Sequence, residues 1–566
     1  MDTQRLIALI IFTFSGFMLW TGWQKHNAPP PAPASTTVAA ATGTTPTLAP
    51  TPVTPGATPA AAVSPQAVPS AAPAPADKRI SVQTDLLQVE INTLDSDIRQ
   101  VVLLKHPAHG DATKPLTLMQ DKVGHYFIAQ SGLLGLSANR PAPKWVASQD
   151  HYELGGADKV EVRLTDSETP GLLVTKVYTF TRGSYVIDVR FEVKNDTAAA
   201  VTPTAWYQFV RDGNPPEGES AGGNMFTSGV VTFTGPSLYS EAKKYRKVAF
   251  GDIDKRKNDE EFVEEEATDG WISIVQHYFV SVWLPGANVK RSFFTRKWKD
   301  TNLYSAGVKV GLPTIAAGSQ ASFSMPLYVG PQEQAHLKAL APGLDLVVDY
   351  GMLAILAVPM FEILSWINKV VGNWGWTIIL FTILIKAVFF PLNQKAGKSM
   401  AHMKQLAPKM EAMKQRYGDD KVKLNQAMMD LYKTEKINPL GGCLPILVQM
   451  PFFIALYWVL LGAVELRNTP WIGWIHDLSS PDPYYILPII MGVSMIVQTK
   501  LNPAPPDPVQ AKVMMIMPIV FSFMFLFFPS GLVLYWTMQN LLGIGQQWYI
   551  NKHIAEMEKK DKAHGK

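Results

Sequence analysis

The sequence predicts a membrane protein built from an α-helical bundle of six transmembrane helices and a large antiparallel β-sandwich domain. The chain has 566 residues, of which 47% are hydrophobic, and this is too polar for a protein that lies wholly in a membrane. Six apolar runs are long enough to form spans. Between the first and the second run, polar and apolar residues alternate as in strands. The six runs are residues 6–23, 374–392, 440–464, 484–499, 513–528 and 532–550.

The first run lies within residues 1–26, which we interpret as an N-terminal transmembrane signal anchor. It follows a short polar lead that contains Arg5, and it ends before Lys25. A cleavable signal peptide is the alternative, because residues 32–34 (Ala-Pro-Ala) resemble a cleavage site. The apolar run is longer than the apolar part of an ordinary signal peptide, so we favour the anchor.

Residues 27–77 are predicted to form a disordered linker. Between residues 27 and 76 there is no charged residue, and 13 prolines are interspersed with Ala, Thr and Ser. Such a composition cannot bury a hydrophobic core, so the segment should be extended and tether the next domain loosely.

Residues 78–345 carry the strand-like alternation and form the predicted β-sandwich. A hairpin is expected around residues 182–184, because alternating segments lie on both sides of this Arg-Gly-Ser turn. His106 and His109 form an isolated HxxH, and no motif of a hydrolase, zinc protease or phosphate-binding loop is present. We therefore predict a binding or structural module with no metal site and no enzymatic activity.

Residues 349–371 are predicted to form an amphipathic helix that lies in the membrane interface. Apolar residues alternate there with Glu362, Ser365, Asn368 and Lys369. A further transmembrane span is the alternative, but the charged residues within the segment disfavour it.

The span at residues 374–392 contains Lys386, which costs about 2.5 to 3.5 kcal/mol to place in a membrane. On a helical wheel Gly375, Thr382, Lys386 and Asn393 lie within about 40° of one another. This polar stripe should face a bundle interior or a wet cavity, because no other predicted span contains an Asp or Glu that could pair with the lysine. The alternative is that Lys386 extends its ammonium to the interface.

Charge patterning predicts the orientation of the spans. Residues 393–438 contain ten Lys/Arg against five Asp/Glu, so this helical hairpin, broken near Pro408 and Gly418, should be cytoplasmic. The third to sixth spans then fill residues 440–550, and residues 551–566 form a basic cytoplasmic tail. Both termini are expected inside and the β-domain outside.

Three sequence stretches carry a family resemblance. NPLGGCLPILVQMPFFIALYWVL from Asn438, WIHDLSSPDPYYILPIIMG from Trp474 and FPSGLVLYW from Phe528 resemble the YidC/Oxa/Alb family of bacterial membrane protein insertases. The resemblance covers roughly residues 349–550, and the first span with the β-domain resembles the Gram-negative form of the family, whose large domain is periplasmic.

The resemblance implies a five-helix insertase core around a positively charged hydrophilic groove that is open to the cytoplasm. It implies an insertase and chaperone of inner-membrane proteins that works alone or with the Sec translocon, without a cofactor. Lys386 stands where the family usually has arginine, so the charge is kept and the planar guanidinium is lost. The implied groove residues are Lys386, Thr382, Gln449, Tyr535 and Trp536. The implied apolar slide consists of Phe452, Phe453, Met514, Met517, Phe521 and Met524.

The Met- and Phe-rich character of the run at residues 513–528 fits such a slide, because these side chains re-pack against varied apolar partners. A lipid-facing helix is the alternative for this run.

The implied partners are nascent inner-membrane proteins, the Sec translocon with its accessory subunits, and membrane lipids. The ribosome and a targeting receptor are further candidates, and no direct nucleic-acid contact is expected. The expected location is the bacterial inner membrane.

A secondary transporter would also place a cation inside the membrane, but it should show inverted repeats, and the six runs show no internal duplication. An intramembrane protease would need paired catalytic side chains that the runs lack, and a simple anchor for the β-domain would not need Lys386.

Overall fold

The structure is a computed structural model that describes residues 78–108, 111–136, 143–216, 233–256, 260–418, 420–435, 444–501 and 508–563. The predicted signal anchor (residues 1–26) and linker (residues 27–77) lie outside the described residues, as does His109. All elements below belong to the compact unit Val68–Lys566.

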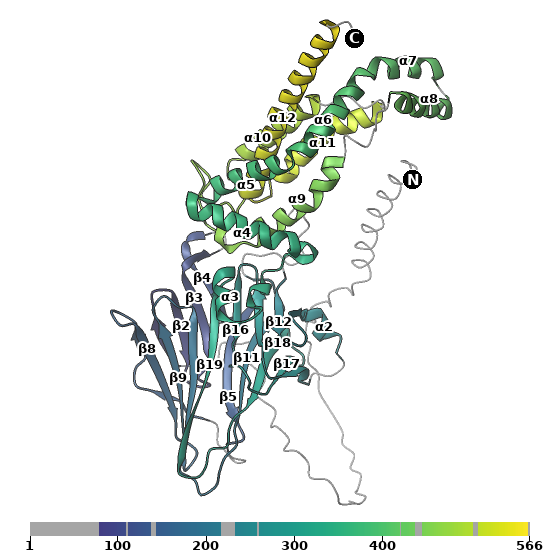
Figure 1. Ribbon diagram of the computed structural model, residues 1–566. Coiled ribbons are helices and arrows are strands. Elements are labelled where there is room, and N and C mark those ends of the chain that lie inside the picture. Colours follow the sequence, from purple (N-terminus) through teal and green to yellow (C-terminus); the bar gives the residue numbers. More distant parts are fainter. Residues whose placement is uncertain are drawn as a thin grey trace, which may run out of the picture. The chain divides into compact units, whose positions relative to one another are not determined.

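The β-rich part consists of two sheets of ten and nine strands, coloured purple to teal in Figure 1. The neighbours pair antiparallel, except that β1 and β7 pair parallel. In spatial order the first sheet contains β14 (Phe262–Ala267), β17 (Arg291–Lys297), β18 (Leu303–Gly311), β11 (Thr204–Asp212), β5 (His125–Leu134), β4 (Asp111–Lys122), β3 (Ile98–Ala108), β2 (Leu87–Asn92), β1 (Arg79–Gln83) and β7 (His151–Glu153). The second contains β13 (Arg246–Lys247), β12 (Gly235–Tyr239), β15 (Trp271–Gln276), β16 (Phe279–Trp283), β19 (Ser319–Pro331), β10 (Val186–Asn195), β9 (Leu172–Thr181), β8 (Lys159–Asp166) and β6 (Val146–Ala147).

The hairpin predicted around residues 182–184 is confirmed. Strands β9 and β10 pair antiparallel in a register that brings Phe180 opposite Ile187. Gly183 in the turn has a φ of 68°, a left-handed conformation that glycine adopts without a steric penalty. Along β10 buried residues alternate with more exposed ones, because successive side chains point to opposite faces, whereas residues 174–178 of β9 are all buried.

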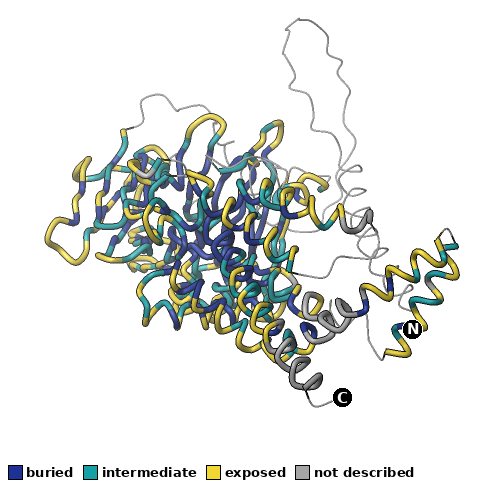
Figure 2. The backbone as a smooth tube through the Cα atoms, turned by 90° about the horizontal axis from the view of Figure 1, so that it is seen from above, coloured by how far each residue is buried: buried dark blue, intermediate teal, exposed yellow. Residues whose placement is uncertain are grey.

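Both sheets contribute to one apolar core, which includes Val89 of the first sheet and Phe191 of the second. Figure 2 shows buried segments in dark blue gathered towards the middle of the backbone, with exposed segments in yellow around them. The strands alternate because their inner face packs into this core.

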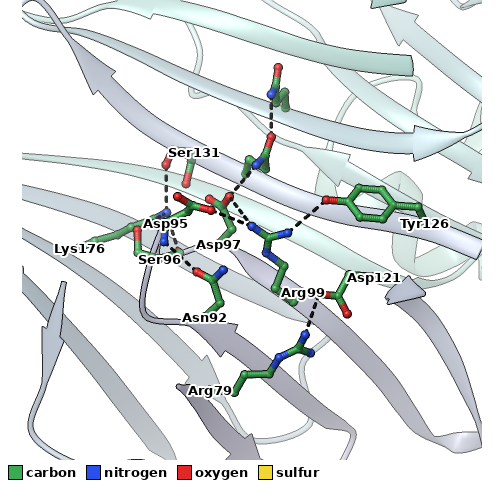
Figure 3. A network of polar contacts seen from close by, with 12 residues as sticks. Arg79, Asn92, Asp95, Ser96, Asp97, Arg99, Asp121, Tyr126, Ser131 and Lys176 are labelled. Carbon is green, nitrogen blue, oxygen red and sulfur yellow. Dashed lines mark hydrogen bonds and ion pairs between the residues drawn. The ribbon is translucent and has the colours of Figure 1, made fainter. Parts of the chain in front are cut away.

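A buried polar network crosses from one sheet to the other (Figure 3). The Nζ atom of Lys176 on β9 donates to the carbonyl oxygens of Ser96 over 2.9 Å and of Ser131 over 3.0 Å. Asp97, which is also buried, accepts a hydrogen bond from Gln130 Nε2 over 2.7 Å. Burial raises the pKa of the Asp97 carboxyl, while the nearby Lys176 ammonium opposes that rise.

One short helix, α2 (Phe250–Asp254), lies between β13 and β14, and the helical part follows the strands along the chain. Its helices are α3 (Gln334–Leu340), α4 (Ala354–Val371), α5 (Trp374–Val388), α6 (Phe390–Gln405), α7 (Ala407–Tyr417), α8 (Lys421–Thr434), α9 (Leu444–Gly462), α10 (Ile486–Leu501), α11 (Pro508–Phe525) and α12 (Ser530–Ala563). Short 3-10 turns are η1 (Leu344–Val347), η2 (Gly351–Leu353) and η4 (Val464–Leu466).

In the described part of the chain, α4 is the one helix that is long and apolar enough by itself to cross a membrane. Helix α5 with the start of α6 forms a second, bent candidate, and α9, α10 and α11 contain shorter apolar stretches. The β-rich domain and the helical core are thus present, while the count of six spans and the interfacial position of α4 stay predictions.

The predicted span at residues 374–392 is broken rather than straight. Helices α5 and α6 meet at Phe389 with a bend of 60°. Pro391 follows this break, and its missing N–H cannot donate to the carbonyl of Ala387 as a continuous helix would require. The break separates the Lys386 segment from the hairpin helices that follow.

The range 393–438, predicted as a helical hairpin, contains α7 and α8, which follow most of α6. Pro408 occupies the first turn of α7, and Gly418 follows its last residue. The helices share a small core of Leu406, Met410 and Leu431. Outside this core the hairpin has few buried side chains among the residues described.

Candidate substrate groove

Lys386 lies in the last turn of α5 and is half-buried. No residue in the described ranges forms an ion pair or accepts a hydrogen bond from its ammonium. The ammonium lies close to Gly543 of α12 and to Gln498 of α10: a β-carbon added to Gly543 would be 3.6 Å from Lys386 Nζ and 3.0 Å from Gln498 Nε2. Three helices therefore bring two hydrogen-bond donors to one place.

A chain of side-chain amides lies on α6, α9 and α12. Gln449 Nε2 donates to Asn393 Oδ1 over 3.3 Å, and Asn393 Nδ2 donates to Gln546 Oε1 over 3.5 Å. Gln449 is 8% exposed, and Gln546 Nε2 is buried with no hydrogen-bond partner in the described structure. A buried donor without a partner favours binding of an oxygen acceptor.

Thr382 shares the predicted stripe with Lys386, but its hydroxyl is used within its own helix. The side chain is fully buried, and Oγ1 donates to the carbonyl oxygen of Ile378 over 2.6 Å. This bond to the residue four positions earlier is common for threonine in a helix. The structure therefore places Thr382 in the packed part of α5 and leaves Lys386 at the less buried end.

Tyr535 and Trp536 pack against the aromatic ring of Phe453. The Trp536 ring stacks on Phe453 with centroids 5.5 Å apart, and the Tyr535 ring meets Phe453 edge-on at 6.0 Å. Trp536 also contacts Phe525 of α11 at 5.6 Å. Tyr535 is only 2% exposed, so these residues form an aromatic wall that joins α9, α11 and α12.

The six residues predicted as an apolar slide occupy different environments. Phe452 packs edge-on against Phe389 at 5.1 Å, and Phe453 belongs to the aromatic wall. Phe521 and Met524 are partly buried against the helical core. Met517 is 44% exposed, and Met514 has intermediate exposure.

The bundle is tied together at the end opposite the hairpin by the loop between α9 and α10. Pro481 of this loop forms an isolated bridge with Pro529, and the N–H of Gly531 donates to the carbonyl of Leu478 over 2.9 Å. Asp482 is 1% exposed and accepts three hydrogen bonds. These contacts hold the loop against the start of α12.

The same loop covers the start of α5. The indole of Trp471 lies against Gly375, where a β-carbon would come within 2.1 Å of its ring. Gly375 also belongs to the predicted stripe, and this indole covers the stripe at that position. The polar stripe of α5 is consequently accessible towards Lys386 and closed towards Gly375.

Sequence reasoning missed Gln498, Gly543 and Gln546. A signal for the last two was present, because Gln539, Asn540, Gly543 and Gln546 follow each other at the three- and four-residue spacing of one helix face. Asn540 Nδ2 donates to Ser494 Oγ of α10 over 3.2 Å, in agreement with an inward-facing stripe. Gln498 follows Ser494 at the four-residue spacing of one face of α10, so a shorter signal of the same kind was present there.

The chemistry of the site is that of a cationic, donor-rich surface beside aromatic and apolar side chains. Within the described ranges no group of three or more His, Cys, Asp and Glu residues could hold a metal ion. A cation without a counter-ion attracts acidic groups and carbonyl oxygens. The arrangement suits binding of a polar peptide segment more than covalent chemistry.

Comparison with known families gives matches over both parts of the chain. The family model described as 60Kd inner membrane protein matches residues 366–559, and the model of the YidC periplasmic domain matches residues 79–363. The first of these ranges contains every residue of the candidate groove.

Similar full-length proteins are known from other bacteria. The membrane protein insertase YidC of Aromatoleum aromaticum is 51% identical over 560 residues, which cover 99% of each chain. The protein of the same name from Dechloromonas aromatica is 50% identical, with 98% of each chain covered. A crystal structure of an active YidC insertase is 18% identical and covers 84% of this chain and 93% of that one, with a TM-score of 0.38.

Proposed function

The chain belongs to the YidC family of membrane protein insertases, and on this premise we propose that the surface around Lys386 receives the polar segments of proteins entering the inner membrane. The observation that carries the proposal is the Lys386 ammonium, which has no counter-ion among the described residues and lies between α10 and α12. A buried or half-buried cation is costly unless a ligand or water compensates it.

The proposed path separates the polar and the apolar parts of a substrate. The polar segment enters the groove, where Lys386, Gln498 and Gln546 offer donors to its oxygens. The apolar segment moves along the aromatic and Met-rich side of the bundle into lipid. Burial of about 20 apolar residues in the hydrocarbon core supplies the driving force, so no nucleotide is required.

A lysine in this position attracts carboxylates without fixing their geometry. An ammonium is a compact point charge, whereas a guanidinium presents a planar fork that binds a carboxylate through two parallel bonds. We therefore expect Lys386 to act through charge, which makes arginine a functional replacement.

The membrane topology and the stacking of the two sheets are part of the same proposal. The chain is proposed to cross the membrane six times with both termini in the cytoplasm, with α4 in the interface and with the two sheets stacked as a periplasmic sandwich. The excess of basic residues in residues 393–438 supports this orientation. The loop that ties Pro481 to Pro529 would then close the groove on the periplasmic side.

The proposed partners follow from the family. Nascent inner-membrane proteins are the substrates, and the Sec translocon with its accessory subunits is the proposed assembly partner. The ribosome and a targeting receptor are proposed to meet the cytoplasmic hairpin and the basic tail.

The test compares native, Lys386→Arg and Lys386→Ala chains after reconstitution in liposomes, with insertion of a small single-span substrate measured by protease protection. Native and arginine chains should insert the substrate, and the alanine chain should lose about tenfold or more in rate. Lys395→Ala is the matched control, because Lys395 is an exposed lysine on α6.

Insertion at equal rates by all chains would remove Lys386 from the mechanism and leave the family function in place. No insertion by the native chain would overturn the proposed function itself.

A further inference from the structure

Gly543 lies in the middle of α12, where a glycine weakens a helix by about 0.8 to 1.0 kcal/mol relative to alanine. Its φ is not in the left-handed region, so the backbone does not require a glycine there. The side chains around it supply a reason: Gln498 Nε2 and Lys386 Nζ lie 3.0 Å and 3.6 Å from the place that a β-carbon would take.

We propose that Gly543 is a positioning residue of the groove, because its missing side chain leaves the space in which the Lys386 ammonium and the Gln498 amide point at an incoming segment. The inference rests on the proposed function and extends it to a residue outside the predicted site. Both groups are donors, and neither has an acceptor among the residues described, so the space suits a carboxylate or carbonyl oxygen of the substrate.

The geometry predicts a graded response to side-chain size. An alanine would press only on the end of the flexible Gln498 side chain and would sit at ordinary van der Waals distance from Lys386 Nζ. A leucine would occupy the space itself and push both donors away. Alanine should therefore be tolerated and leucine should not.

The chain offers a matched control two residues further along. Gly545 lies in the same helix and is exposed, and a β-carbon added to it would meet no atom within 4 Å. A general effect of replacing a helical glycine should appear equally at both positions. An effect that acts through Lys386 and Gln498 should appear only at Gly543.

The experiment measures insertion by the full-length chain in liposomes for Gly543→Ala, Gly543→Leu and Gly545→Leu. Two single-span substrates are used, one with an acidic translocated segment and one in which Asp and Glu are replaced by Asn and Gln. Gly543→Ala and Gly545→Leu should stay within about twofold of native, while Gly543→Leu should lose about fivefold or more. A loss confined to the acidic substrate identifies a carboxylate as the bound group, and a loss on both identifies the peptide carbonyls.

A rescue separates positioning from damage to the helix packing. Gln498→Asn in the Gly543→Leu chain shortens the amide side chain and keeps its N–H donors, so it should restore at least about half of the lost rate, with Gln498→Asn alone as control. If Gly543→Leu does not accumulate in the membrane, Gly543→Val serves in its place.

Equal losses at Gly543 and Gly545, or no rescue by Gln498→Asn, would overturn the inference. If Lys386→Ala abolishes insertion while Gly543→Leu is harmless, the proposed function stands and the positioning role of Gly543 falls.

Discussion

The backbone N–H and the hydroxyl of Ser530 both donate to the carbonyl oxygen of Ser480, each over 2.8 Å. Ser480 lies in the loop between α9 and α10, and Ser530 is the first residue of α12. Ser530 is fully buried, so water cannot replace these bonds. This pair of residues joins the loop between α9 and α10 to the helix that carries Gly543 and Gln546.

Replacing Ser530 by alanine removes one of the two bonds and keeps the backbone bond. The expected cost is about 1 kcal/mol, the net value of a typical hydrogen bond. Thermal unfolding of the detergent-solubilised chain should show a small decrease in the midpoint. An unchanged midpoint would mean that the hydrogen bond of the Ser530 hydroxyl does not contribute to the stability of the fold.

Replacing Asp482 should destabilise the chain more than replacing Ser530. The buried carboxylate of Asp482 accepts hydrogen bonds from Trp474 Nε1 over 3.1 Å, from the N–H of Tyr484 over 3.0 Å and from the N–H of Leu487 over 2.7 Å. Asp482→Ala leaves these donors unpaired and should destabilise the chain by about 2 to 4 kcal/mol. Asp482→Asn keeps an acceptor oxygen and should lie between alanine and native in the same unfolding measurement. A smaller loss of stability for Asp482→Ala than for Ser530→Ala would contradict the role assigned to the Asp482 carboxylate.

Lys176 is predicted to be a sensitive position of the β-rich part, because its side chain is fully buried and donates three hydrogen bonds. Lys176→Met should cost about 3 to 5 kcal/mol, because the buried Asp97 would lose one of its two nearby cations, keeping Arg99 at 3.9 Å, and the carbonyls of Ser96 and Ser131 would lose a donor. Chemical denaturation of the purified full-length chain, followed by tryptophan fluorescence, measures the loss. Adding Asp97→Asn to Lys176→Met should recover part of the lost stability, since it removes the buried charge that Arg99 alone compensates less well. A double variant as unstable as the single one would show that the charge is not the cause.

Glu465 should make stability depend on pH. Burial raises the pKa of its carboxyl to about 7, and its Oε2 atom is buried without a hydrogen-bond partner in the described structure. The folded chain holds the proton more tightly than the unfolded chain, so this contribution to stability is full below pH 4.5 and is lost as the pH rises through about 7.

At pH 8 Glu465→Gln should therefore be more stable than native by about 1 to 3 kcal/mol, and at acid pH the two should converge. Thermal midpoints of both chains between pH 5 and about 8 test this, with the acid end as internal control. A constant difference across that range would rule out the carboxyl as the titrating group.

Much of the architecture could be predicted because it depends on neighbours along the chain. Period-two alternation indicated the strands, and the turn at residues 182–184 indicated the hairpin of β9 and β10. Pro408 and Gly418 indicated where α7 begins and ends. The family resemblance was carried by local motifs in the helical part, and the family matches confirm it.

The candidate site could be predicted only in part. Lys386 was found because a charge inside an apolar run is costly whatever surrounds it. Thr382 was placed beside it by helical periodicity, yet its hydroxyl bonds to Ile378, because a wheel gives the direction of a side chain and not its partner. Pro391 was visible in the sequence, but the 60° bend that it accompanies was not predicted.

The sequence by itself determined the strand and helix pattern, the single charge within the apolar run at residues 374–392, and the family. Only the tertiary structure decided that Lys386, Gln498 and Gly543 meet, and that Ser530 holds the loop at Ser480. The physical reason is the range of the forces. Propensity and periodicity act within a few residues of one element, whereas the meeting of three helices depends on how their surfaces pack, and on the space that a missing side chain leaves between them.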